Sequence, residues 1–81
     1  MERGKHETKL REFLKSLVIQ QLVRIPSNKG AVIRHDHKTW ALFEDGNPWR
    51  SRWGTLDQVT EDLVYFEQYG CLPPTAPALH W

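Results

Sequence analysis

The first periodic pattern in the chain consists of apolar residues spaced three and four positions apart. They are Leu10, Phe13, Leu14, Leu17 and Val18. This spacing places the five side chains on one face of a helix. We therefore predict an amphipathic helix from about Thr8 to Gln20, whose start is poorly marked and remains open to an earlier position.

From Leu22 onward the pattern changes to short runs that are rich in β-branched and aromatic residues. The runs read LVRIP, AVIR, TWALF and WRSRW, and they alternate with SNKG, HDHK and EDGN. The first group has the composition of strands and the second has the composition of turns. We predict an antiparallel meander of three to four strands.

The turn residues also predict how the strands pair. Asp45-Gly46 indicates a two-residue hairpin turn, because glycine tolerates the positive φ that such a turn demands. This turn pairs Leu42 with Trp49, and the neighbouring pairs follow from the regular alternation of side chains along the two strands.

A second loop, centred on Asp36-His37, pairs Ile33 with Trp40, and the two registers agree on which side chains share a face. The predicted core face holds Ala31, Ile33, Trp40, Leu42, Trp49 and Trp53. The predicted outer face holds Val32, Arg34, Thr39, Ala41, Phe43, Arg50 and Arg52.

A second helix is predicted after the last strand. Thr55 and Gln58 have the spacing of a capping box, in which both side chains satisfy early backbone N–H groups. Gly70 supplies a stop signal at the other end. The apolar stripe between these signals consists of Leu56, Val59, Leu63 and Phe66.

The last eleven residues, CLPPTAPALHW, contain three prolines. We predict a single α+β domain over residues 1–70 and an extended, polyproline-like tail over residues 71–81. Leu72, Leu79 and Trp81 are unusually apolar for a free tail. We expect the tail either to pack along the protein's own surface or to engage another chain.

The elements together predict an α+β fold in the order αββββα, with both helices packed on one face of the sheet. This order resembles the double-stranded-RNA-binding domain in topology and size. The family's lysine cluster at the start of the second helix is not matched, because Asp57, Glu61 and Asp62 occupy this region. Its Gly-Pro-x-His loop is also missing, so the resemblance implies a topology and no site residues.

Length and composition limit the class of protein. The 81 residues suffice for one domain, and 40% hydrophobic with 26% charged residues is ordinary for a globular protein. The lone cysteine, Cys71, excludes an internal disulfide and a multi-cysteine zinc site. The charged start MERGKHETKLRE, and the lack of a run of about 20 apolar residues, predict a cytoplasmic protein without a membrane span.

The charge is unevenly distributed along the chain. Residues 1–40 carry nine Lys and Arg against four Asp and Glu, whereas residues 41–81 carry two against six. Such an asymmetry can orient a charged partner or a second copy of the chain. We favour the alternative that the two halves neutralise each other internally.

The stretch IRHDHKTW raises the question of a histidine site. His35 and His37 would share a face of a straight strand and offer two imidazoles to a metal, or an acid and a base to a small nuclease. The predicted register instead places His37 in the hairpin loop and His35 at a strand end. We therefore predict a solvated hairpin tip, with no metal and no cofactor.

The arginines of PWRSRW are the sharpest functional candidates. On the predicted outer face Arg50 and Arg52 join Arg34 and Phe43, where they would contact an acidic protein partner or grip the phosphates of a nucleic acid. A third alternative is that the charges only keep an exposed strand soluble. We predict a small non-enzymatic binding module with a regulatory or accessory role, which contacts protein partners or a second copy and uses Trp81 of the tail as a further contact. Nucleic-acid binding through the same arginines is the alternative, and a small histidine-dependent nuclease or hydrolase is the third.

Overall fold

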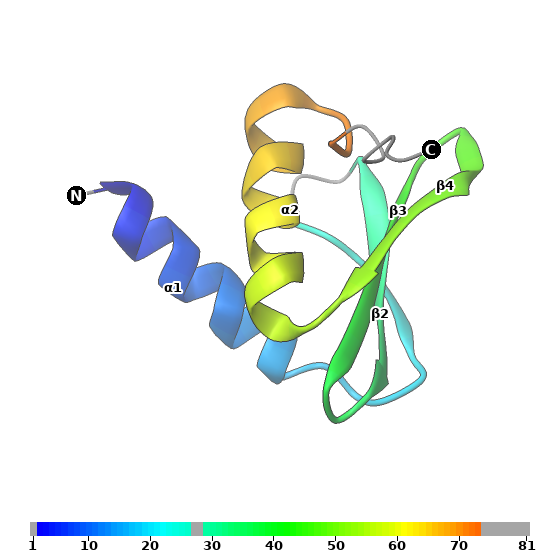
Figure 1. Cartoon of the computed structure of the whole chain (residues 1–81), viewed down its shortest axis with the longest axis horizontal. Coiled ribbons are helices and arrows are strands. Elements are labelled where there is room, and N and C mark those ends of the chain that lie inside the picture. The colour runs from blue at the N-terminus through cyan, green and yellow to red at the C-terminus, as the bar shows by residue number, and fades with distance from the viewer. Residues whose placement is uncertain (1, 27–28, 74–81) are drawn as a thin grey trace, which may run out of the picture.

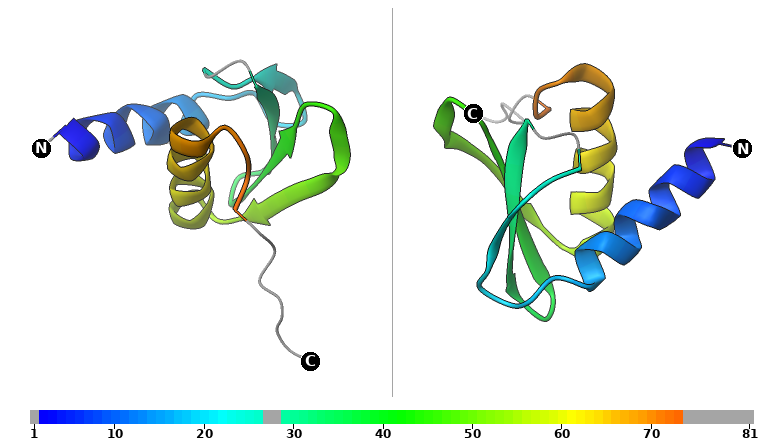
Figure 2. Two further views of the ribbon diagram at one scale, coloured as in Figure 1. Left: turned by 90° about the horizontal axis from the view of Figure 1, so that it is seen from above. Right: turned by 180° about the vertical axis from the view of Figure 1, so that it is seen from behind.

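The computed structural model describes residues 2–26 and 29–73, and it has the predicted αββββα order (Figure 1). The elements are α1 (Glu2–Lys15), β1 (Leu22–Arg24), β2 (Gly30–Asp36), β3 (Thr39–Glu44), β4 (Asn47–Gly54) and α2 (Leu56–Tyr69). The strands form one antiparallel sheet in the order β1-β2-β3-β4. Both helices lie on the same side of the sheet (Figure 2), which confirms the predicted fold class.

The hydrophobic core lies between the two helices and the sheet. Three residues of the predicted α2 stripe, Val59, Leu63 and Phe66, are fully buried, and Leu56 packs against them. The core residues of the other elements are Leu10, Leu14, Leu17, Ile25, Val32, Trp40, Leu42 and Leu72. No helix in the described part of the chain is long and apolar enough to span a bilayer.

The first helix starts and ends earlier than predicted. α1 runs from Glu2 to Lys15, so Val18 lies beyond it and is exposed instead of belonging to the core. The last carbonyls of α1 are bonded by residues from the sheet. The indole Nε1 of Trp40 donates to the carbonyl of Leu14 at 2.8 Å, and Nη1 of Arg34 donates to the carbonyl of Lys15 at 2.9 Å.

The second helix begins and ends at the predicted capping residues, Thr55 and Gly70. The backbone N–H of Gln58 donates to the Thr55 hydroxyl at 3.4 Å. At the other end Gly70 adopts a left-handed conformation, with φ of 77°, and its N–H donates to the carbonyl of Phe66. A side chain at Gly70 would be strained in this conformation, which explains why α2 ends at a glycine.

The predicted pairing of β2 with β3 is wrong by one residue. Arg34 lies opposite Trp40, where Ile33 was expected, and the turn is His37-Lys38 closed by the pair of Asp36 with Thr39. The Asp36 carboxylate accepts the backbone N–H of Lys38 at 2.8 Å, a local bond that fixes this turn. A slip of one residue moves every side chain of β2 to the opposite face.

The predicted pairing of β3 with β4 holds only beside the turn. Glu44 pairs with Asn47 around Asp45-Gly46, and Gly46 has the expected positive φ of 74°. The next pair is Phe43 with Ser51, so β4 advances four residues while β3 advances one. Pro48 lies in this irregular stretch and has no N–H to donate to the ladder. Beyond this stretch each β3 residue pairs with a β4 residue three positions later than predicted. Because three is an odd number, every β4 side chain there lies on the face opposite to the predicted one.

The predicted faces are therefore correct for β3 and wrong for β2 and β4. Cross-strand partners share a face of the sheet. The helix-facing side carries Val23, Val32, Arg34, Trp40, Leu42, Arg50 and Arg52. The opposite side carries Leu22, Ala31, Ile33, His35, Ala41, Phe43, Ser51 and Trp53. The predicted core position of Trp49 concerns a side chain outside the described part of the structure.

Packing continues past residue 70. Leu72 is only 2% exposed and belongs to the core. Residues 74–81, including the predicted contact residue Trp81, lie outside the described residues.

Candidate binding surface on the open face of the sheet

The two central histidines lie at a solvated hairpin tip, as predicted. His35 is near the end of β2, His37 is in the turn, and both are exposed. The hydrogen bond from the Lys38 N–H holds the pKa of Asp36 below its ordinary value. Within residues 2–26 and 29–73, no three His, Cys, Asp or Glu side chains are grouped closely enough to hold a metal ion.

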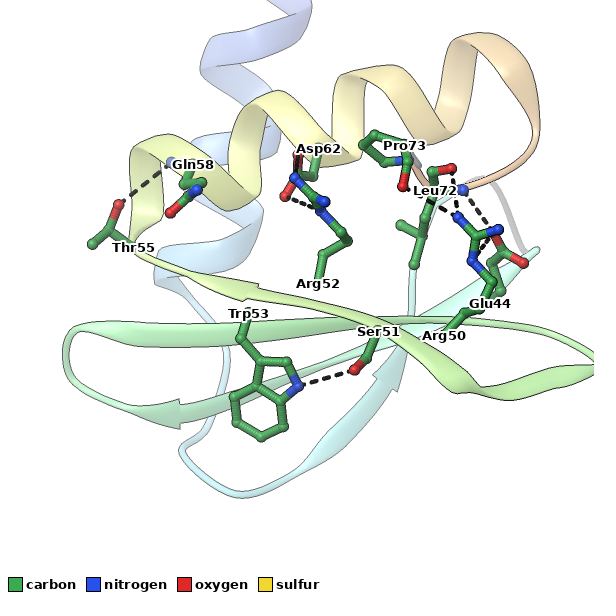
Figure 3. Close-up of polar contacts among 10 residues, drawn as sticks. All are labelled: Glu44, Arg50, Ser51, Arg52, Trp53, Thr55, Gln58, Asp62, Leu72 and Pro73. Carbon is green, nitrogen blue, oxygen red and sulfur yellow. Dashed lines mark hydrogen bonds and ion pairs between the residues drawn. The ribbon is translucent and has the colours of Figure 1, made fainter. Parts of the chain in front are cut away.

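The predicted surface of three arginines and Phe43 does not exist as one surface. Arg50 and Arg52 point toward α2 (Figure 3). The register of β3 with β4 places Phe43 on the other side of the sheet. Arg34 also lies on the helix side, with its guanidinium 4.9 Å from the ring centre of Trp40. The shared-face prediction is wrong because it rested on the two registers, and contact of these arginines with a partner stays a prediction.

Arg52 makes an ion pair with α2. Its Nε lies 3.2 Å from Oδ2 of Asp62, and its Nη2 lies 3.4 Å from Oδ1. Asp62 is buried although it carries a charge. The arginine is therefore what makes an aspartate tolerable on the inner face of α2.

Arg50 and Glu44 hold the segment that follows α2. Nη2 of Arg50 donates to the carbonyls of Leu72 and Pro73 at 3.3 and 3.2 Å. The Glu44 carboxylate accepts the backbone N–H of Leu72 at 2.8 Å. We call this arrangement the Glu44–Arg50 clamp. It holds residues 72 and 73 beside β3 and β4 (Figure 3).

The side of the sheet away from the helices is apolar and partly exposed. We define the open sheet face as Leu22, Ile33, His35, Phe43 and Trp53, whose side chains lie on the same side as the fully buried Ala41. Trp53 is 51% exposed and Leu22 is 61% exposed, and no helix in the described part of the chain covers this side (Figures 1 and 2). Apolar surface of this kind on a small domain is typical of a contact site.

Trp53 is the central side chain of the open sheet face. Its ring centre lies 5.6 Å from that of His35 and 6.4 Å from that of Phe43, with interplanar angles of 70° and 83°. Both are favourable edge-to-face arrangements. The indole N–H donates to the Ser51 hydroxyl at 3.1 Å. These contacts fix the orientation of a large side chain that is half in solvent.

His35 has further partners that fix its position. The amide nitrogen of Gln20 donates to the His35 carbonyl at 2.6 Å and lies 3.2 Å from its Nδ1. One ring nitrogen therefore has a protein neighbour, and the ring itself packs against Trp53. These contacts orient the imidazole as part of the open sheet face.

The rim of the open sheet face is electrically balanced. Arg24 of β1 and Asp45 of the β3–β4 turn form a two-pronged ion pair, with distances of 2.8 and 2.7 Å. The side-chain hydrogen bond lowers the pKa of Asp45 and raises that of Arg24. The pair adds polar character beside the apolar residues without adding net charge.

Charge pairs join the basic first half of the chain to the acidic second half. They are Arg11 with Asp57 (2.6 Å) and Arg24 with Asp45 (2.7 Å). A hydrogen bond of 2.6 Å between His6 Nε2 and Glu67 Oε1 also joins the two halves. This pairing agrees with the internal alternative for the charge asymmetry.

Sequence reasoning missed the open sheet face because it assigned Ile33 and Trp53 to the core. The available signal was Pro48, since a proline inside a strand indicates an edge strand or a bulge. A bulge at that position, applied to the pairing, moves Trp53 to the outer side. Comparisons with protein-family models, with curated proteins and with solved structures find no match to this chain.

Proposed function

We propose that this protein is a small non-enzymatic binding module that uses the open sheet face to bind protein, and that a second copy of the chain is the partner. The proposal keeps the predicted class of function and replaces the arginine surface with the opposite side of the sheet. Two open faces would stack as the sheets of a β-sandwich do, about 10 Å apart.

The observation that carries the proposal is the half-exposed Trp53, held edge-on by His35 and Phe43 on an apolar sheet face. Tryptophan is among the residues that contribute most to protein interfaces. A side chain already fixed by its neighbours loses little rotamer entropy when a partner covers it. Exposed Leu22 extends the same apolar surface toward the edge of the sheet.

Charge favours a protein partner over a nucleic acid at this surface. Phosphate binding needs cations, and the guanidiniums of Arg34, Arg50 and Arg52 make contacts on the other side of the sheet. Arg24 at the rim is paired with Asp45. Two identical, electrically balanced faces meet without like-charge repulsion, and a two-fold dimer is the commonest assembly of identical chains.

Nucleic-acid binding remains the second candidate, now through aromatic rings. Trp53, Phe43 and His35 present three rings on a sheet, and bases of single strands stack on such rings. Binding of this kind would weaken with salt.

The test is sedimentation equilibrium over a wide range of protein concentration, at low and near-physiological salt. We expect a monomer–dimer equilibrium that the Trp53→Ala substitution weakens by about thirtyfold or more, as for an interface hot spot. Tyr69→Ala is the matched control, because Tyr69 is an equally exposed aromatic on α2. It should leave the equilibrium unchanged.

Two results would overturn the proposal. One is a protein that stays monomeric at the highest concentration, and the other is a dimer that is indifferent to Trp53→Ala. A parallel fluorescence titration with single-stranded oligonucleotides separates the second candidate. Saturable binding that salt and Trp53→Ala both weaken, by a monomeric protein, would replace the dimer with nucleic-acid recognition.

A further inference from the structure

A groove of about 370 Å³ lies along α2, on the helix side of the sheet and therefore away from the open sheet face. Its walls come from α2 and from the residue where the described chain ends. The lining residues are Glu61, Asp62, Val64, Tyr65, Gln68, Tyr69 and Pro73. Nothing in the proposed function uses this groove.

Two tyrosines give the groove an aromatic wall. The ring centres of Tyr65 and Tyr69 are 4.4 Å apart and the planes are tilted by 44°. Tyr69 is 60% exposed, so much of its ring is open to a ligand. Aromatic-lined grooves of this type receive proline-rich segments in the polyproline II conformation, since such segments are extended before they bind.

The chain itself enters the groove at Pro73. Leu72 is anchored in the core, and the Glu44–Arg50 clamp bonds its N–H and the carbonyls of Leu72 and Pro73. Figure 3 shows Pro73 beside α2, at the end of this anchored segment. The clamp therefore holds Pro73 at the wall of the groove.

The sequence after Pro73 has the proline-rich composition that binds to aromatic-lined grooves. Residues 74–81 read PTAPALHW, with prolines at positions 74 and 77 and no acidic residue to meet Glu61. Eight residues in a polyproline II conformation span roughly 25 Å, at about 3.1 Å per residue, which is ample to cross the groove. We propose that the groove beside Tyr65 and Tyr69 binds the chain's own residues 74–81.

Because residues 74–81 are attached to the same chain as the groove, binding of this segment is favoured over binding of the same segment from a second molecule. A short linker gives an effective concentration in the millimolar range, so a weak polyproline contact suffices when it is intramolecular. The linker here is minimal, because the anchored Pro73 already lines the groove.

The test is paramagnetic relaxation enhancement on the full-length chain. Cys71→Ser removes the single native thiol, which is exposed, and Ala78→Cys provides a site for a nitroxide label. The strongest broadening is expected at the amides of residues 61–69, with little at Phe43 and Trp53. Adding Tyr69→Ala should reduce this broadening severalfold, and Tyr69→Phe should keep it.

A mixture of spin-labelled protein with unlabelled, isotope-enriched protein measures contact between molecules. Broadening at residues 61–69 in this mixture would mean that the segment docks on a second copy, and would overturn the proposal. So would broadening centred on Leu22, Ile33 and Trp53, or broadening without a preferred site. Failure here leaves the dimer proposal intact, because Trp53→Ala and Tyr69→Ala act on different surfaces.

Discussion

Arg52 reaches from β4 to α2 and places its Nε 3.2 Å from Oδ2 of Asp62. Both side chains are largely buried, and the arginine faces the core side of the sheet although it belongs to an edge strand. A charged pair in this position ties β4 to α2 and disfavours a one-residue shift of β4. Such a shift would bring Ser51 or Trp53 to the place of Arg52 and leave the Asp62 carboxylate without its counter-ion.

Removing one partner of this pair should be costly. We expect Arg52→Ala to lower the free energy of unfolding by about 2–3 kcal/mol, because it leaves the Asp62 carboxylate buried without its counter-ion. Urea unfolding followed by circular dichroism measures the loss. The double substitution Arg52→Met and Asp62→Leu should recover part of it, since no buried charge then remains.

The control is the exposed pair of Arg11 with Asp57, which also has a short distance of 2.6 Å. Arg11→Ala should change the free energy of unfolding by at most about 0.5–1 kcal/mol, because solvent screens exposed ion pairs. Equal losses for Arg11→Ala and Arg52→Ala would show that burial of Asp62 has no energetic weight.

The Glu44–Arg50 clamp predicts protection of one backbone amide. Glu44→Ala removes the acceptor of the Leu72 N–H, so hydrogen exchange at Leu72 should accelerate by about ten- to a hundredfold, as for loss of a hydrogen bond to a charged group. Glu44→Gln retains a side-chain oxygen and should keep most of the protection. Unchanged exchange in Glu44→Ala would contradict the clamp.

The rim pair predicts a shifted titration. The hydrogen bond from Arg24 lowers the pKa of Asp45, so its carboxyl should titrate below the ordinary value of about 3.9. A lowered folded-state pKa means that this stabilisation is present above the unfolded-state pKa and is lost as the pH falls through the folded-state pKa. Carbon-detected NMR measures the pKa directly. Arg24→Ala should raise it, and an identical pKa in the two proteins would refute the pairing.

Gly30 predicts a steric limit where the sheet meets α2. A Cβ at this position would collide with the carbonyl oxygen of Phe43 and lie 2.8 Å from the Phe66 ring. Because a backbone atom of a central strand moves little, Gly30→Ala should cost about 1–3 kcal/mol in thermal or urea unfolding. Gly54→Ala is the comparison and should cost less, since the nearest atom to its Cβ is the movable side-chain oxygen of Gln58, at 2.6 Å, and the fixed Gln58 Cβ is 3.1 Å away. A loss as large for Gly54→Ala would contradict the steric explanation.

The elements of this fold follow from local pattern, whereas the faces of its sheet do not. Thr55, Gly46 and Gly70 carry their signals within a few residues, because caps and turns depend on local backbone geometry. A strand register depends on every irregularity between two turns. The hydrogen bond between Asp36 and Lys38 and the break in strand pairing at Pro48 each involve only a few residues. Each is nevertheless enough to place the side chains of a whole strand on the face opposite to the predicted one.

The residues of the candidate site were predicted incorrectly for the same reason, because the face that each strand residue occupies depends on the strand registers. Arg34, Arg52 and Arg50, which were predicted on the outer face, bond to α1, to α2 and to the residues after α2, respectively. Trp53, which was predicted in the core, lies on the open sheet face. Residue type alone does not predict which of these side chains is buried. Arginine and tryptophan each occur in protein interiors and on protein surfaces when their polar atoms are hydrogen-bonded.

The bonds from Trp40 and Arg34 to the last carbonyls of α1 link the stability of the helix end to that of the sheet. They join residues 26 and 19 positions apart, so the last turn of α1 takes these two hydrogen-bond partners from β3 and β2. We expect hydrogen exchange at the end of α1 to be coupled to opening of the β2–β3 hairpin, because separating the two elements breaks both bonds.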